Sequence, residues 1–123
     1  MYAAETLERQ MERGVAWELA LDAEGAPVGF LSTTHDAASG RMELNKLYLL
    51  PALQGRGNGQ AMLQRVLVKA AAAGASEVHL RVNKGNRRAI TAYERAGFRI
   101  RESLVQDIGG GFVMDDFVME KKL

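Results

Sequence analysis

The feature that most constrains the fold is an apolar strand that runs directly into a glycine-rich turn. Residues 47–59 read LYLLPALQGRGNG. Because glycine permits positive φ and close backbone approach, successive N–H groups of such a turn can point at one anion. A helix pattern follows and adds the positive end of its dipole; its predicted apolar stripe is Met62, Leu63, Val66, Leu67, Ala70 and Ala71. The segment therefore predicts a phosphate-binding turn.

Two common phosphate-binding turns do not fit these residues. A P-loop needs Lys followed by Ser or Thr after its glycines, and no such pair is present here. A dinucleotide-binding turn needs a third small residue, but that position is Gln60 counted from Gly55 and Met62 counted from Gly57. What remains is the pattern Gln-x-x-Gly-x-Gly, which begins at Gln54. A surface turn without a ligand is the alternative that the turn alone leaves open.

A second motif narrows the choice. Residues 86–98 read NRRAITAYERAGF and follow a predicted buried strand at residues 77–82. This segment is similar to the signature N-x-x-A-x-x-x-Y-x-x-x-G-F. With both motifs in this order and separation, the chain resembles the GNAT N-acetyltransferase superfamily, and the resemblance extends from about Val15 to Leu123. In that family the first turn holds the pyrophosphate of acetyl-coenzyme A (acetyl-CoA).

The sequence pattern predicts a single α/β domain over residues 1–123. Its length suits one hydrophobic core. Hydrophobic periodicity and glycine stops predict helices at residues 3–13, 57–73 and 86–97, and strands at residues 15–22, 28–34, 42–50, 77–82, 98–104 and 112–120. Val15, Trp17, Leu19 and Leu21 are expected on one face of their strand. The resemblance specifies the GNAT fold, a central mixed and mostly antiparallel sheet flanked by helices.

One departure from the family pattern concerns the N-terminus. GNAT proteins usually begin with another strand and helix, whereas this chain starts at what resembles the second helix, so we expect an N-terminally shortened member. An uncovered sheet edge tends to pair with another strand, which predicts a homodimer. A CoA-binding module without acetyl-transfer activity is therefore the alternative function.

Composition excludes several other classes. The net charge is +1, with basic and acidic residues interspersed, so no long-range field favours nucleic acid or an anionic membrane. The chain has no cysteine, which excludes disulfides, thiolate metal sites and a cysteine nucleophile. No apolar run reaches the length of a bilayer span, and the N-terminus lacks a signal-peptide pattern. A cytoplasmic protein is expected.

The resemblance implies acetyl transfer from acetyl-CoA to an amine in a ternary complex, without a metal. Main-chain N–H groups of residues 55–60 would hold the pyrophosphate, and the strand at Leu47–Leu49 would pair with the pantetheine arm. The family's main-chain amide near Leu49 would polarise the thioester carbonyl. The predicted cofactor-binding set is Leu47, Tyr48, Leu49, Gln54, Gly55, Arg56, Gly57, Asn58, Gly59, Gln60, Asn86 and Tyr93. The alternative for Arg56 is a solvated loop residue, and the alternative for Asn86 is a helix N-cap.

Two residues are predicted to move protons. Tyr93 lies at the motif position of the acid that protonates the leaving thiolate; the alternative is an ordinary helix tyrosine whose hydroxyl is satisfied locally. Glu43 lies eleven residues before Gln54, at the offset of the base glutamate in the histone-acetylating branch. An edge carboxylate with no such role is the alternative. A second branch places its base where this chain has Arg81, so that solution does not apply.

Other polar residues are weaker predictions. His79 lies on the predicted strand at residues 77–82 and is read as structural, and His35 as solvent-facing. Asp115 and Asp116 would suit a cationic amine at a pocket mouth, but solvated strand charges explain them as well. The acceptor stays open among small amines, polyamines, amino acids, antibiotics and protein amines, because the fold does not determine the substrate.

Overall fold

The computed structural model describes residues 4–5, 15–55 and 57–123. The described residues form these elements in chain order: β1 (Ala4–Glu5), β2 (Val15–Leu21), β3 (Pro27–Asp36), β4 (Arg41–Leu49), the 3-10 helix η1 (Pro51–Leu53), α1 (Asn58–Ala72), β5 (Glu77–Asn83), α2 (Arg87–Arg95), β6 (Arg99–Gly109) and β7 (Phe112–Lys122). The predicted strands from residue 15 onward and both predicted C-terminal helices are therefore confirmed, with shifted ends.

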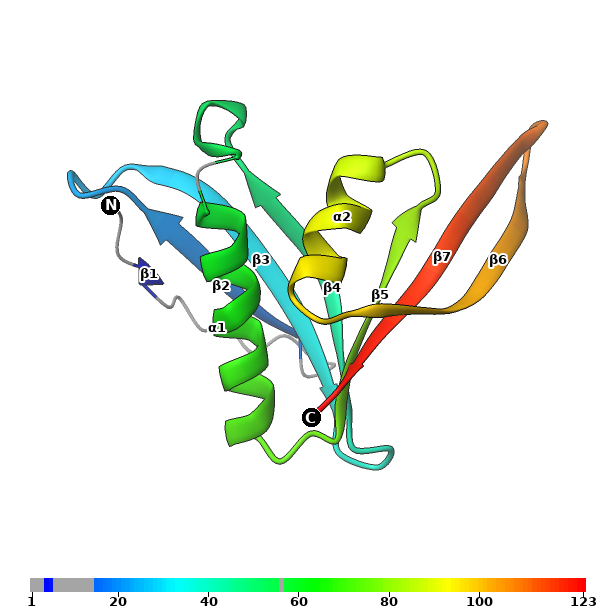
Figure 1. The fold of residues 1–123 in the computed structure, drawn as a ribbon, viewed down its shortest axis with the longest axis horizontal. Helices are drawn as coiled ribbons and strands as arrows, with labels where there is room; N and C mark the ends of the chain where they lie inside the picture. The colour runs from blue at the N-terminus through cyan, green and yellow to red at the C-terminus, as the bar shows by residue number, and fades with distance from the viewer. Residues whose placement is uncertain (1–3, 6–14, 56) are drawn as a thin grey trace.

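The strands form one sheet in the order β1-β2-β3-β4-β5-β7-β6. All neighbouring pairs are antiparallel except β4 and β5, which confirms a mixed, mostly antiparallel sheet. Helices α1 and α2 lie on the same face of this sheet (Figure 1). The core fills the space between them and the sheet, and its most buried side chains include Met42, Leu63, Leu80 and Met119.

The apolar stripe of α1 is confirmed at five of its six predicted positions. Met62, Leu63, Val66, Leu67 and Ala70 are buried. Ala71 is exposed instead, although its neighbour Ala70 is fully buried, so the buried stripe is narrower than predicted at this end of the helix.

The N-terminal prediction needs correction where the structure describes it. Ala4 and Glu5 form a short strand that pairs with Ala20 and Leu19 of β2, whereas a helix was predicted over residues 3–13. Main-chain pairing along the open edge of β2 satisfies backbone groups at these two positions. The rest of the predicted helix lies outside the described residues.

The alternation in β2 also has an unexpected inner face. Glu18 and Ala20, not the apolar set at Val15, Trp17, Leu19 and Leu21, are the buried side chains of this strand. The carboxylate of Glu18 is only 4% exposed, and its Oε1 lies 2.9 Å from Nη2 of Arg65 on α1. The opposite face carries an aromatic row instead, with Phe30 between Trp17 and Tyr48.

A bulge in β4 opens the sheet. The β3–β4 register passes from Ser32–Lys46 to Thr33–Leu44, so Asn45 is the extra residue. The parallel pairing of β4 with β5 ends at Leu44 and Leu80, beside this bulge. Beyond that point the two strands diverge, and α2 lies over the opening between them (Figure 1).

The β6–β7 hairpin is longer than predicted and projects beyond the rest of the sheet (Figure 1). Its turn is formed by Gly110 and Gly111, both at positive φ, which is the two-residue turn that matches strand twist. Several apolar side chains near the tip are exposed: Val105, Ile108, Phe112, Val113 and Met114.

Candidate functional site

The glycine-rich turn is braced by side chains from within the same segment. Gln54 donates its Nε2–H to the carbonyl oxygen of Leu49 at 2.9 Å, and Asn58 donates Nδ2–H to the carbonyl oxygen of Leu53 at 3.1 Å. Both side chains therefore hold the shape of the turn. Asn58, Gly57 and Gln60 belong to the turn and the first helical residues, whereas the predicted site residue Arg56 lies outside the described residues.

The N-terminus of α1 suits an anion. Gly57 is its N-cap, in the left-handed conformation with φ of 80°, and no side chain caps the helix there. The N–H groups of a helix's first turn have no acceptor within the helix, and the dipole makes this end positive. A Cβ built at Gly57 or Gly59 meets nothing within 4 Å, so open space lies above both glycines. The turn therefore fits a pyrophosphate.

A cavity of 330 Å³ adjoins this turn and lies between β4, α1 and α2. Its lining contains eight members of the predicted cofactor-binding set: Leu47, Tyr48, Leu49, Gln54, Gly55, Gly59, Asn86 and Tyr93. Four more lining residues were not predicted, namely Leu63, Arg88, Ala89 and Ala92. The two sequence motifs, which begin at Gln54 and at Asn86, thus meet at one cavity.

Near its end, the β4 main chain turns N–H groups toward the cavity. Leu50 donates its N–H to the carbonyl oxygen of Val28 on β3, and Tyr48 pairs with Phe30. Because bonding direction alternates along an antiparallel ladder, the N–H groups of Leu47 and Leu49 point away from β3. They point into the opening left by β5, where an extended ligand arm can pair with them.

Asn86 and Tyr93 project from the two ends of α2. Asn86 is the N-cap, and its Oδ1 accepts from the N–H of Ala89 at 3.2 Å, so its predicted capping role is confirmed. The Tyr93 ring packs edge-on against Phe98, with 5.9 Å between ring centroids. Its hydroxyl has no hydrogen-bond partner among the described residues. Burial raises the pKa of Tyr93 above its ordinary value, which keeps the hydroxyl protonated at neutral pH.

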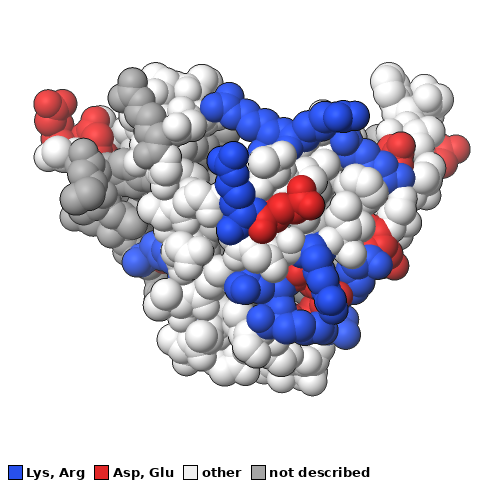
Figure 2. Space-filling model, viewed as in Figure 1, with Lys and Arg blue, Asp and Glu red and all other residues white. Residues whose placement is uncertain are grey.

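Arg88 is the charged residue among the four lining residues that were not predicted. A Cβ on Gly55 would lie 3.2 Å from its Nη2, so the guanidinium lies directly over the glycine-rich turn. None of the described residues forms an ion pair with it. Figure 2 shows basic side chains gathered over α2 and its N-terminal end. The place of Arg88 two residues after Asn86, within the second motif, is the sequence signal that could have identified it as a lining residue.

Glu43 lies on the other face of the sheet. It lines a second cavity, of 410 Å³, that begins where β4 leaves β5. Its neighbours there are Leu44, Asn45, Arg81, Asn83, Gln106, Met114 and Asp116. The parallel register places His79 beside Glu43. Tyr93 and Glu43 therefore line different cavities, on opposite sides of the opening between the two strands.

The two adjacent aspartates of β7 have different surroundings. Asp115 is half-exposed and forms an ion pair with Lys84, as expected of a solvated strand charge. Asp116 is only 3% exposed and lines the second cavity, so the same interpretation does not hold for it.

Comparison with known proteins agrees with both motifs. The model of the acetyltransferase (GNAT) family matches residues 2–98. Two proteins named as uncharacterized N-acetyltransferases, from Mycobacterium tuberculosis strain H37Rv and from Mycobacterium bovis, are each 40% identical over 82 residues. The match covers 67% of this chain and 52% of each relative, so the chain spans about half the length of the curated relatives it matches.

Solved structures share the fold at low sequence identity. An IAA acetyltransferase from Bacillus cereus has a TM-score of 0.82 at 18% identity, with both chains fully covered. A spermidine N-acetyltransferase from Vibrio cholerae, in complex with CoA and spermine, has a TM-score of 0.79 at 20% identity over 90% of this chain and 67% of that one. Nourseothricin acetyltransferase scores 0.78 at 22% identity, over 89% and 65%.

Neither helix that the structure describes is long and apolar enough to cross a membrane. The family model covers most of the chain, and both of its signature motifs line one cavity. The chain belongs to the GNAT family of acetyltransferases.

Proposed function

We propose that the chain transfers an acetyl group from acetyl-CoA to a primary amine by direct attack in a ternary complex. The observation that carries this proposal is the first cavity. There the uncapped helix N-terminus, the outward N–H groups of β4 and the Tyr93 hydroxyl, which bonds to none of the described residues, lie around one space. The V. cholerae structure with CoA and spermine supports the pairing of a CoA cavity with an amine acceptor in this fold.

The cofactor would be held mainly by main-chain groups. The N–H groups from Gly55 to Gln60 suit the pyrophosphate, and Arg88 supplies a cation beside them. Leu47 and Leu49 would pair with the pantetheine arm as an added strand. The N–H of Leu49 would also polarise the thioester carbonyl.

Proton transfer is assigned to two groups on opposite sides of the strand opening. An ammonium must lose a proton before its nitrogen can attack, and the carboxylate of Glu43 is the proposed acceptor. Tyr93 would donate its hydroxyl proton to the departing thiolate. In balance, one N–C bond forms, the C–S bond breaks, CoA leaves as the thiol and one net proton reaches solvent.

The experiment is acetyl-CoA-dependent thiol release, followed with a thiol-reactive dye against a panel of amines. The chain has no cysteine, so it contributes no background. Amine-stimulated release is expected, and Gly59→Ala should abolish it by filling the space above the turn.

The possible outcomes separate the proposal from its rival. Binding of acetyl-CoA without release for any amine would contradict acetyl transfer and favour a CoA-binding module. Failure of acetyl-CoA to bind at all would contradict both.

A further inference from the structure

The second cavity has a charge arrangement that resting side chains do not satisfy. Its lining contains the carboxylates of Glu43 and Asp116 and the guanidinium of Arg81, which leaves a net charge of −1. Glu43 is half-buried and forms no ion pair with any described residue. A single positive charge would neutralise this space.

Asp116 is the most informative member of the lining. Only 3% of it is exposed, and its Oδ1 is buried with no hydrogen-bond partner among the described residues. Its other oxygen, Oδ2, lies 3.5 Å from Nη2 of Arg81. Buried carboxylate oxygens normally have partners, because leaving one unpaired costs free energy. The resting side chains at this wall of the cavity therefore balance the charge of Asp116 only in part.

Another buried carboxylate on the same face shows the contrast. Glu77 is 3% exposed, and both of its oxygens accept hydrogen bonds, from Lys122 and from Arg101. Both oxygens of Glu77 are thus satisfied by side chains. At Asp116, which lines the cavity, Oδ1 has no hydrogen-bond partner among the described residues.

We infer that Asp116 binds the ammonium group of the acceptor, together with Glu43, and that the acceptor is a small primary amine with one positive charge and a polar body. This inference rests on the proposed function, since it names the substrate class of the same reaction. The carboxylates of Asp116 and Glu43 supply the negative charge beside the ammonium, and the neutral amides of Asn45, Asn83 and Gln106 lie around the rest of the molecule.

The remaining lining disfavours two other amine classes. A polyamine brings a second ammonium, which would lie among neutral amides without a carboxylate partner. An amino acid brings a carboxylate close to Glu43 and Asp116. Arg81, the cation among the described lining residues, is already engaged by Asp116 and by Oε1 of Gln106 at 3.4 Å.

The first test uses the unaltered protein and compares ethanolamine, spermidine and glycine as acceptors in the thiol-release assay. Ethanolamine is expected to show a kcat/KM at least 10-fold above the other two. A higher value for spermidine or for glycine would overturn the assignment of substrate class, while leaving the acetyl-transfer proposal intact.

The second test is Asp116→Asn, with Asp115→Asn as the matched control. Asp115 is adjacent in sequence but pairs with Lys84 and does not line the cavity. Asp116→Asn should raise the KM for ethanolamine at least 10-fold and leave the KM for acetyl-CoA unchanged, and Asp115→Asn should change neither. An unchanged amine KM in Asp116→Asn would overturn the role of Asp116.

Calorimetric titration of ethanolamine into the CoA-bound protein separates failure of this inference from failure of the proposed function. Binding that is lost in Asp116→Asn supports the ammonium site even if no amine is acetylated. No binding by the unaltered protein overturns it. Acetyl-CoA affinity of each variant, measured in parallel, shows that the fold is retained.

Discussion

The side chain of Gln60 on α1 donates its Nε2–H to the carbonyl oxygen of Ala92 on α2 at 2.8 Å, and so joins the two helices beside the first cavity. Gln60→Ala removes this bond but keeps the main-chain N–H. We expect a loss of about 1 kcal/mol in stability, because a single side-chain hydrogen bond contributes roughly that amount. Acetyl-CoA affinity should fall several-fold as the helices separate.

The matched control for that prediction is Gln64→Ala, one turn later on α1, where the side chain is exposed and bonds to no described residue. Thermal melts of both variants measure their stability, and acetyl-CoA titrations measure their affinity. A lowered Tm in Gln60→Ala with unchanged affinity would show that the bond is structural only.

The glycines of the turn give a pair of substitutions with opposite effects on stability. Gly59 lies in α1 without positive φ, so Gly59→Ala should stabilise the helix by about 0.5–1 kcal/mol while blocking the space for the pyrophosphate. Gly57 has φ of 80°, so Gly57→Val adds backbone strain of about 1–2 kcal/mol. Both should lose acetyl-CoA affinity, measured by titration. Full affinity in Gly59→Ala would refute the phosphate-binding assignment.

Tyr93→Phe tests the proposed acid. General-acid catalysis typically contributes about 10²–10⁴-fold, so we expect kcat to fall at least 100-fold. The Tm and the KM for acetyl-CoA should stay the same, since the hydroxyl bonds to no described residue.

The pH profile gives a second readout for Tyr93. Because the pKa of Tyr93 is raised, the unaltered protein should lose activity only above about pH 10, where the phenol ionises. Tyr93→Phe should lack this alkaline limb. An unchanged kcat in the variant would remove Tyr93 as the acid.

The sequence predicts the first cavity well and the second poorly. The first cavity is built from two motifs. Each is one continuous stretch of sequence, in which the glycines and polar residues have fixed spacings. The second is assembled across β4, β5, β6 and β7, so only register brings Glu43, Arg81 and Asp116 together. No spacing along the chain encodes that arrangement, and for this reason Asp116 and Asp115 could not be distinguished.

Alternation in β2 shows a different limit. The apolar residues Trp17 and Leu19 share one face as predicted, yet the buried positions of the strand are Glu18 and Ala20 on the other face. An ion pair with Arg65, forty-seven residues later, places the carboxylate against α1. A prediction from hydrophobic periodicity assumes that charged side chains face solvent. That assumption fails where a charged side chain pairs with a residue distant in the sequence and is buried.

Homodimerisation remains a prediction, and β6, which ends the described sheet opposite β1, is the edge on which we test it. Its outer side has no strand partner among the described residues, and an antiparallel copy centred on Ser103 places Arg99 opposite Asp107. Sedimentation should show a dimer at micromolar concentration. Val105→Lys, which would bring the new ammonium against Arg101 of the second copy, should dissociate it. A monomer at all concentrations would contradict the prediction.

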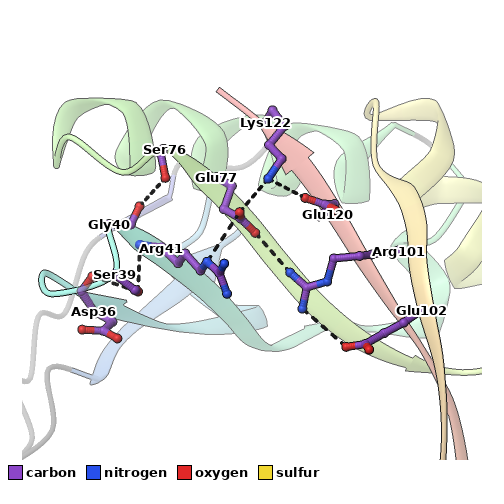
Figure 3. A network of polar contacts seen from close by, with 10 residues as sticks. All are labelled: Asp36, Ser39, Gly40, Arg41, Ser76, Glu77, Arg101, Glu102, Glu120 and Lys122. Atoms are coloured by element: carbon purple, nitrogen blue, oxygen red, sulfur yellow. Dashed lines mark hydrogen bonds and ion pairs between the residues drawn. The ribbon is translucent and has the colours of Figure 1, made fainter.

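Glu77 provides a prediction about stability and pH. Its buried carboxylate accepts a hydrogen bond from Nζ of Lys122 at 2.9 Å and lies within ion-pair distance of Arg41 and Arg101 (Figure 3). The Lys122 hydrogen bond lowers the pKa of Glu77 below its ordinary value, with the neighbouring charges adding to the effect. Since the unfolded chain takes up this proton at higher pH, the contribution to stability is complete above about pH 5 and is lost as pH falls through the folded-state pKa.

We therefore expect Glu77→Gln to lower stability by about 2 kcal/mol at pH 7, in keeping with hydrogen bonds that involve charged groups. The difference from the unaltered protein should shrink as pH falls from 5 to 3, because protonation then neutralises the native carboxylate as well. Chemical denaturation across this range measures both effects. Glu24→Gln is the matched control, since Glu24 is exposed in the β2–β3 turn and forms no ion pair with described residues. A constant difference at all pH values would show that the Glu77→Gln substitution acts through packing alone and that the charge of Glu77 contributes nothing.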